Sequence, residues 1–306
     1  SYTTVGDYSG LFGYVSGANI RNLRVEGSAK VQGVHFGALM GYVEGTVLVE
    51  NVVTDVDITG DRSGVTGDGG MIGRLEGPVT FINCATLGTM GNVGTSMYCG
   101  FVAYAGNGSS ALNNCFTASK LTEGTSTDYC YTFCRGTAIY NNCYYVNAIG
   151  TKDGGTQITE DMLASGELCY MLNGDQSTIG WYQTLGEDAL PVPSASHAQV
   201  YANGELKCDG TSVGGELVYS NSATSSIPPH NYDDGWCSVC GAWQTNYLTA
   251  DNEGYYNVGS ANDFAWIAKY IEQGNPNINI KLTADIDLTT SKFPNVMLGN
   301  GSNQYA

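Results

Sequence analysis

The chain has few charged residues and very few basic ones. Only 13% of its 306 residues are charged, and 12 lysines and arginines accompany 29 aspartates and glutamates, which gives a net charge of −17 at pH 7. Nucleic acid and anionic membrane surfaces repel such a chain. No run of eighteen apolar residues is present, so we expect no membrane span. The acidic composition favours a secreted or surface protein.

The sequence also lacks recognisable catalytic motifs. Its only histidines are His35, His197 and His230, and they belong to no Ser-His-Asp order. No nucleophile elbow, phosphate-binding loop or dinucleotide fingerprint occurs. A signal peptide is missing before Ser1, so we expect a mature product or an excised piece. We predict that the protein is not an enzyme.

One dense acidic run leaves room for other chemistry. It contains Asp55, Asp57, Asp61 and Asp68, with Arg62 as the only basic neighbour. Asp55 and Asp57 would point the same way along a strand, which suits a calcium site or the paired carboxylates of a β-helical polysaccharide-degrading enzyme. Lyases of this kind usually need a Lys or Arg base. We favour the simpler interpretation, a solvated acidic turn.

Regular repeats dominate the first half of the chain. Five asparagines follow one another at intervals of 29, 32, 31 and 28 residues, each in a short phrase such as IRNLRVEG or FINCATL. About ten residues before each asparagine comes a glycine-rich phrase such as SGLFGYVSG or GALMGYVEG. A period near thirty residues is typical of a solenoid. The repeated asparagines are Asn22, Asn51, Asn83, Asn114 and Asn142.

Each repeat is predicted to be one coil of a parallel β-helix. The apolar runs are short, rich in β-branched and aromatic residues, and bounded by Gly, Ser, Asn and Asp, as strands require. Stacked coils lie about 4.8 Å apart. We therefore expect the asparagines to form an internal ladder, in which each amide bonds to its neighbours. The next positions, Leu23, Val52, Cys84, Cys115 and Cys143, form a second column, which we interpret as apolar core thiols rather than disulfides.

The regularity ends near residue 155, and the segment 156–202 is predicted to cover the solenoid end. A helix is expected between Thr159 as N-cap and Gly174 as stop, and two short strands follow. Such a cover protects the open edge of the last coil. Trp181 and Tyr182 are interpreted as packed aromatics, with a sugar-stacking pair as the alternative.

These phrases together resemble a known family. SGLFGYVSGANIRNL is similar to the GLUG-type repeat of bacterial surface and secreted β-helix proteins, and LASGELCYMLNG with GWYQTLGEDALPVP resembles the segment that closes such solenoids. The resemblance covers about two thirds of the chain. It implies a right-handed parallel β-helix and an adhesin or cell-surface role, and it implies no shared catalytic residues.

A small zinc-ribbon-like module is predicted over residues 203–246. Cys237 and Cys240 form a Cys-x-x-Cys-Gly knuckle, and Cys208 and His230 complete a tetrahedral Cys3His set for structural zinc. The segment has few aliphatic residues, so a metal would replace the missing core. A disulfide between Cys237 and Cys240, or from Cys208 to either, is the alternative. Seven other cysteines remain, and an odd number cannot all pair within one chain.

The last segment, 247–306, is predicted to form a helix followed by one strand. The helix is expected to begin at Ser260, with Asp263 in the capping-box position, and to stop at Gly274. The strand alternates from Ile278 to Leu288. In GLUG-type proteins a helix and an LTADIDL strand come before the first coil. We name eight apolar residues as an assembly segment: Phe264, Trp266, Ile267, Tyr270, Ile271, Leu282, Ile286 and Leu288.

This order favours a structural role. We expect a unit of an extracellular bacterial surface fibre or adhesin stalk, in which the tail of one copy completes the next solenoid head-to-tail, or one period of a tandem array. Closure on the chain's own first coil and a loose tail stay open as alternatives. The main competitor is a carbohydrate- or host-protein-binding adhesin domain that presents outward tyrosines such as Tyr98, Tyr104, Tyr140 and Tyr144.

Overall fold

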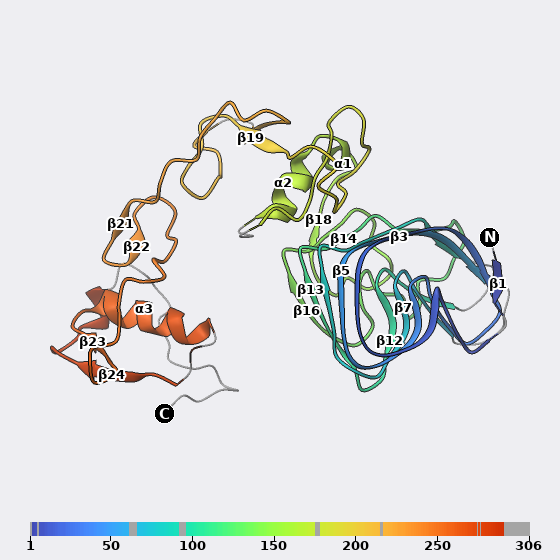
Figure 1. Cartoon of the computed structure of the whole chain (residues 1–306), viewed down its shortest axis with the longest axis horizontal. Helices are drawn as coiled ribbons and strands as arrows, with labels where there is room; N and C mark the ends of the chain where they lie inside the picture. Colours follow the sequence, from blue (N-terminus) through green and yellow to red (C-terminus); the bar gives the residue numbers. More distant parts are fainter. Residues whose placement is uncertain are drawn as a thin grey trace. The chain divides into compact units, whose positions relative to one another are not determined.

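The computed structural model describes residues 2–4, 6–60, 66–91, 96–174, 178–214, 217–273, 275 and 277–290. These fall into two compact units. Unit 1 comprises Ser1–Ala202 and Tyr219–Ala223, and unit 2 comprises Asn203–Val218 and Thr224–Ala306. Figure 1 shows both units. The predicted segments 1–155 and 156–202 thus both fall in unit 1, and the segments 203–246 and 247–306 fall in unit 2 except for residues 219–223.

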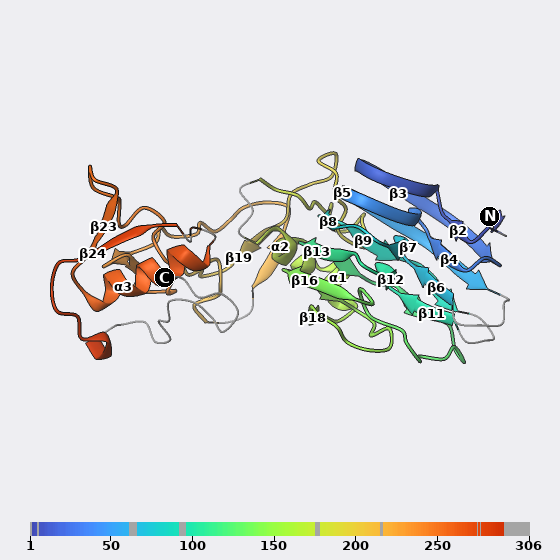
Figure 2. The same ribbon diagram turned by 90° about the horizontal axis from the view of Figure 1, so that it is seen from below.

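Unit 1 is a parallel β-solenoid, as the sequence predicted, and Figure 2 shows its coils side by side. Its strands are β1 (Tyr2–Thr4), β2 (Tyr8–Ser9), β3 (Phe12–Val31), β4 (His35–Gly37), β5 (Met40–Gly60), β6 (Thr66–Gly69), β7 (Ile72–Leu75), β8 (Val79–Ile82), β9 (Ala85–Leu87), β10 (Thr89–Gly91), β11 (Ser96–Cys99), β12 (Val102–Ala105), β13 (Ser109–Asn113), β14 (Phe116–Thr117), β15 (Lys120–Leu121), β16 (Thr137–Asn141), β17 (Tyr144–Tyr145) and β18 (Thr156–Gln157).

The strand register repeats the spacing of the asparagines. Strands of successive coils pair in parallel, and in the row of strands that precedes the asparagines the offsets between partners equal the asparagine intervals. One such row of partners runs through β3, β5, β8, β13 and β16. It contains Ala18, Val47, Val79, Ser110 and Ala138. The thirty-residue period is therefore the length of one coil.

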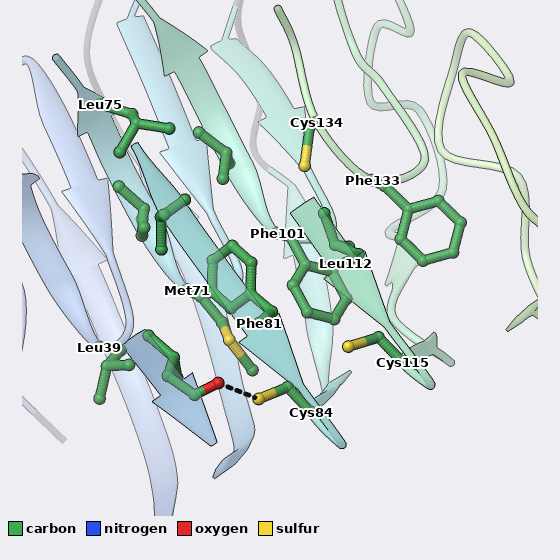
Figure 3. Packing of buried hydrophobic residues seen from close by; sticks show 14 of the residues in the cluster. Leu39, Met71, Leu75, Phe81, Cys84, Phe101, Leu112, Cys115, Phe133 and Cys134 are labelled. Atoms are coloured by element: carbon green, nitrogen blue, oxygen red, sulfur yellow. Dashed lines mark hydrogen bonds between the residues drawn. The ribbon is translucent and has the colours of Figure 1, made fainter. Parts of the chain in front are cut away.

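The glycine-rich phrases place one large apolar side chain per coil at the centre of the solenoid. Leu39, Met71, Phe101 and Phe133 occupy equivalent positions and are all fully buried (Figure 3). The ring centroids of Phe101 and Phe133 lie 5.7 Å apart. A Cβ on the preceding Gly69 would lie 2.1 Å from the carbonyl oxygen of Ile72, so only glycine fits this tight turn.

The asparagines turn the chain at a corner of each coil. All five have left-handed backbone conformation, with φ between 52° and 55°, which asparagine tolerates better than most residues. Their side chains also stack. Asn51 Nδ2 donates to Asn22 Oδ1 at 3.0 Å, Asn83 Nδ2 donates to Asn51 Oδ1 at 3.2 Å, and Asn142 Nδ2 donates to Asn114 Oδ1 at 2.9 Å.

The expectation of an internal ladder is only partly right. Asn22 is exposed, and only Asn83 is fully buried, with 6% of its surface accessible. No hydrogen bond joins the described side chains of Asn83 and Asn114, so the ladder has two segments. The asparagines therefore lie at the margin of the core, where the backbone bends between two faces.

Two short helices cover the last coil, where one helix was predicted. They are α1 (Asp161–Ala164) and α2 (Glu167–Asn173). Gly166 separates them because it adopts φ 90°, and Thr159 is not an N-cap, although Gly174 does follow the last helical residue as expected. Leu168 and Leu172 of α2 pack with Trp181 in one buried cluster.

Unit 2 has little regular structure. Its elements are β21 (Tyr232–Asp233), β22 (Trp236–Cys237), β23 (Tyr255–Val258), α3 (Ala261–Glu272), β24 (Asn279–Leu282) and the 3-10 turn η1 (Leu288–Thr290). The chain passes between the units within β19 (Tyr201–Asn203) and near β20 (Val218–Ser220). The strands β23 and β24 pair in parallel and α3 connects them. Trp243, from the predicted zinc segment, packs against Trp266 of α3, and the centroids of the two rings lie 5.6 Å apart.

The predicted start of α3 is confirmed, whereas the predicted strand is too long. Ser260 Oγ accepts a hydrogen bond from Asp263 N at 3.1 Å, and Gly259 N donates to the Asp263 carboxylate at 2.9 Å. Gly274, the predicted stop, lies outside the described residues. The strand ends at Leu282, opposite Val258, the last residue of its partner β23. Asp287 lies beyond the strand and caps η1, where its Oδ1 accepts from Thr289 N at 2.9 Å.

We expect Asn51→Ala to destabilise unit 1 more than Asn51→Gly. Both variants lose the two ladder bonds of Asn51, which contribute about 0.5–1.5 kcal/mol each, but alanine also has to adopt the left-handed conformation, at about 1–2 kcal/mol more. Urea unfolding of the two variants measures the difference. Equal losses of stability would show that the left-handed corner is unimportant.

Candidate functional site

A tight hairpin in unit 2 presents two of the predicted metal ligands. The strands β21 and β22 pair antiparallel, and their turn residues Asp234 and Gly235 have φ of 51° and 83°, as in a type I′ turn. Past the hairpin, Gly241 N donates to Cys237 O at 2.9 Å. This bond closes the Cys-x-x-Cys loop, so that Cys237 and Cys240 face one point.

A second turn brings Cys208 to the same point. Lys207 N donates to Thr211 O at 2.7 Å, and Gly210, with φ 78°, donates from its N to Lys207 O at 3.0 Å. Asp209 Oδ1 accepts from Thr211 N at 3.0 Å and so fixes the turn. Cys208 is thereby held at the tip of a closed loop.

The four predicted ligands come together in the structure. Cys208 Sγ lies 3.3 Å from Cys237 Sγ, and Cys240 Sγ lies 3.3 Å from His230 Nδ1. All four ligand atoms lie within 4.8 Å of one another, so the group could hold a metal ion. Among the described residues it is the one such cluster of His, Cys, Asp or Glu. The two sulfurs are further apart than the about 2.05 Å of a disulfide, and each cysteine is a free thiol.

The local electrostatics favour one thiolate in this group. Burial opposes ionisation of Cys237, but hydrogen bonds from the backbone N–H groups of Cys240 and Val239 outweigh it and lower the pKa of Cys237 to about 5. Burial and the hydrogen bond with Cys237 raise the pKa of Cys208 to about 12. Metals bind the thiolate form, so the knuckle supplies one ligand ready to coordinate.

The acidic run forms no comparable site. The Asp55 carboxylate accepts from Arg24 Nη2 at 3.0 Å, and Asp57 Oδ1 accepts from Thr89 N at 2.9 Å. Asp68 is fully buried in β6, away from this outward face. Asp61 and Arg62 lie outside the described residues. The described carboxylates of the run are therefore engaged in separate contacts.

The aromatic residues singled out from the sequence do not form one open face. Tyr98 is fully buried, so its expected outward orientation is wrong. The Tyr140 ring lies 5.4 Å from that of Phe133, and its hydroxyl donates to Asp153. Tyr104 is half-buried, with the guanidinium of Arg74 5.3 Å from its ring centroid. Tyr144 is half-buried as well, and its hydroxyl donates to Asn142 Oδ1 at 2.7 Å.

Trp181 and Tyr182 have different environments. Trp181 is fully buried, and its Nε1 donates to Asn114 O at 2.9 Å, so it is a core residue and not half of a sugar-stacking pair. Tyr182 lines a cavity of about 570 Å³ in unit 1. Its walls are the first ladder segment, Asn22, Asn51 and Asn83, and the loop from Thr178 to His197. The sequence did not predict this cavity. Tyr182, considered as half of a sugar-stacking pair, was the one residue proposed for ligand binding that does line it.

The thiol column lies in the core, as the sequence analysis interpreted it. Cys84, Cys115 and Cys143 are all buried, and Cys84 Sγ donates to Val49 O at 3.5 Å (Figure 3). Burial raises the pKa of Cys115 well above its usual value. It does the same for Cys99 and Cys134.

The proposed assembly segment is largely part of the core of unit 2. Trp266, Ile267 and Ile271 are buried there, with Phe264, Tyr270 and Ile286 packed against them. Leu282 and Leu288 are exposed, by 62% and 47%. Only these two leucines are therefore placed to make an external apolar contact.

Comparisons with known proteins return no relatives. No family model, no curated protein and no solved structure matches the chain. Within the described residues, no helix is long and apolar enough to cross a bilayer.

The two classes of cysteine predict a two-step labelling pattern with iodoacetamide. We expect Cys237 to react in the folded, metal-free protein, because its pKa is lowered to about 5, and we expect Cys208, whose pKa is raised to about 12, to react more slowly. The solenoid cysteines should react only after unfolding, because burial shields them from the reagent. Peptide mapping by mass spectrometry identifies the modified sites. Fast labelling of Cys84, Cys115 or Cys143 in the folded protein would contradict the buried column.

Proposed function

We propose that the protein is a structural repeat unit of an extracellular bacterial surface fibre or adhesin stalk. Its solenoid grows when another β-solenoid coil adds to the outer edge of the first coil. The resemblance of its repeats to GLUG-type proteins supports an exported location. The acidic, charge-poor composition agrees with that location.

The exposed edge of β3 is the observation that carries the proposal. Where β1 pairs with β3, Ala29 and Val31 are buried, with 1% and 0% of their surface accessible. Beyond that short cover, Phe12 and Tyr14 of β3 are 41% and 59% exposed. An uncovered edge of this length presents backbone donors and acceptors that recruit a further strand. One more coil would pair with residues 12–27 and cover them, as β1 pairs with and covers residues 29–31.

Unit 2 offers the strand that would complete this edge. The strand β24 pairs with β23 on one side and exposes Leu282. Strand addition from one copy to the next uses backbone bonds for strength and side chains for specificity. The two contact surfaces differ, so the contact is head-to-tail and produces a filament instead of a closed dimer.

We further propose that the metal held by Cys208, His230, Cys237 and Cys240 is zinc in a structural role. Cysteine and histidine are the ligands of structural zinc, and four protein ligands leave no open position for catalysis. The described residues of unit 2 form only one small apolar cluster, around Trp266, and the four ligands lie outside it. The metal would therefore hold the Cys208 and Cys237 turns together.

A single charge at the β3 edge should prevent assembly. We expect Tyr14→Asp and Leu282→Asp to convert long particles into short ones, because a carboxylate buried at the contact loses its hydration. Ile139→Asp is the matched control, since Ile139 is 62% exposed on the last coil. Negative-stain electron microscopy and sedimentation velocity measure particle length.

Three outcomes are informative. Fibres in the parent and control, but not in the two variants, would support the head-to-tail contact. Isolated particles at every concentration would overturn it, and closure within one chain would then be favoured. Unchanged fibres in Tyr14→Asp would show that growth does not use β3.

Zinc binding should depend on His230 and not on His197. We expect one zinc per chain, and a loss for His230→Ala that exceeds the about 10–100-fold weakening caused by removing an outer-shell partner. His197→Ala serves as control because His197 lies in unit 1. Atomic absorption gives the stoichiometry. If the purified protein contains no metal and has two free thiols fewer than its cysteines allow, a disulfide is indicated instead.

A further inference from the structure

The cavity beside the asparagine ladder has the features of a ligand site. It measures about 570 Å³ and lies between the first ladder segment and the loop 178–197. We propose that this groove binds a neutral oligosaccharide. The inference rests on the groove alone and does not require that the chain assembles into fibres.

The ladder gives the groove a regular row of hydrogen-bonding groups. Asn22 uses one oxygen lone pair, Asn83 uses one N–H, and Asn51 uses one of each for the ladder. An amide has two N–H donors and two acceptor lone pairs, so every rung keeps groups for a ligand. Asn83 Oδ1 is buried in the groove wall and accepts no hydrogen bond from the described residues. Sugar hydroxyls both donate and accept, which suits such a mixed row.

The second ladder segment is closed to ligands. Asn142 Nδ2 donates to Met171 O at 3.0 Å and to Leu172 O at 3.1 Å, so α2 covers this rung. Trp181 occupies the position beside Asn114. The ladder is therefore open only over its first three asparagines.

An aromatic ring and an apolar wall complete the groove. Tyr182 is half-buried, and its hydroxyl donates to Ile179 O at 3.1 Å, which holds the ring in place. Val192 and Pro193 line the same side. A fixed ring beside hydrogen-bonding amides can pack against the apolar face of a sugar while its hydroxyls reach the ladder.

Charge pairing disfavours an anionic ligand. Arg24 forms ion pairs with Glu26 and, at 3.0 Å, with Asp55. The carboxylate of Glu50, which lines the groove, is paired as well, because its Oε2 lies 2.9 Å from Arg21 Nε. His197 Nδ1 lies 2.8 Å from the Asp188 carboxylate. A phosphate or carboxylate would have to displace one of these partners, whereas a neutral ligand leaves them intact.

The spacing of the ladder disfavours a peptide. Coils repeat at about 4.8 Å, whereas an extended peptide advances only about 3.2–3.4 Å per residue. A peptide lying along the ladder would therefore lose register with the rungs after one residue. An oligosaccharide has several hydroxyls on each ring and does not need to match a backbone period.

The test uses the full chain and an array of immobilised neutral and sulfated oligosaccharides, followed by calorimetry with the neutral oligosaccharide that binds best. We expect Asn51→Gly to weaken binding by about tenfold, since it removes the amide while glycine keeps the left-handed corner. Tyr182→Ala should weaken it at least as much. Asn142→Gly is the matched control, because it makes the same change in the covered ladder segment. Circular dichroism checks that each variant remains folded.

Binding that falls in Asn51→Gly and Tyr182→Ala but persists in Asn142→Gly would support the groove. No neutral oligosaccharide bound anywhere on the array would overturn the proposal. A preference for sulfated oligosaccharides would overturn it too, as would equal weakening by all three variants. Each of these results is independent of particle length, so failure of the fibre contact and failure of the groove are distinguishable.

Discussion

The left-handed asparagine corner is the constraint on which the solenoid depends. At each corner the backbone needs φ near 50°, and within each ladder segment the side chain bonds to the amide of the next coil. Both conditions hold only if every coil turns at the same place. Strand side chains alternate between two faces, so a slip of one residue would turn the core column of Leu39, Met71 and Phe101 outward. The buried thiols and the groove beside Asn51 depend on the same register.

The two sides of the solenoid differ in how this stacking ends. On the last coil, the Asn142 amide at the end of the ladder donates to a backbone carbonyl of α2, and Trp181 lies beside Asn114. The outer edge of β3 has no comparable cover beyond β1. The proposed growth at the β3 edge rests on that asymmetry. Unit 2 is organised differently. Its described residues form no ladder and no large core, and the candidate metal ligands from two turns converge instead.

Features that repeat along the sequence could be predicted, and features made by distant segments could not. The asparagine interval predicted the coil length. The Cys-x-x-Cys-Gly phrase, together with Cys208 and His230, predicted the group that could hold a metal ion. The groove was missed because it joins the ladder to a loop more than ninety residues beyond Asn83. Two apolar patterns were longer than the elements they form: Gly166 breaks a helix that has an unbroken apolar pattern, and β24 ends at Leu282, opposite the end of its partner β23.

Hydrogen exchange at β3 tests the central claim, that the outer edge of the first coil accepts another coil. About half of the N–H groups in residues 12–27 point away from β5, since a parallel strand bonds alternately to both sides. The account predicts that these groups exchange quickly in dilute protein and become protected in assembled particles, while protection in β13 stays constant. Protection of β3 that is equal in both states would contradict the account.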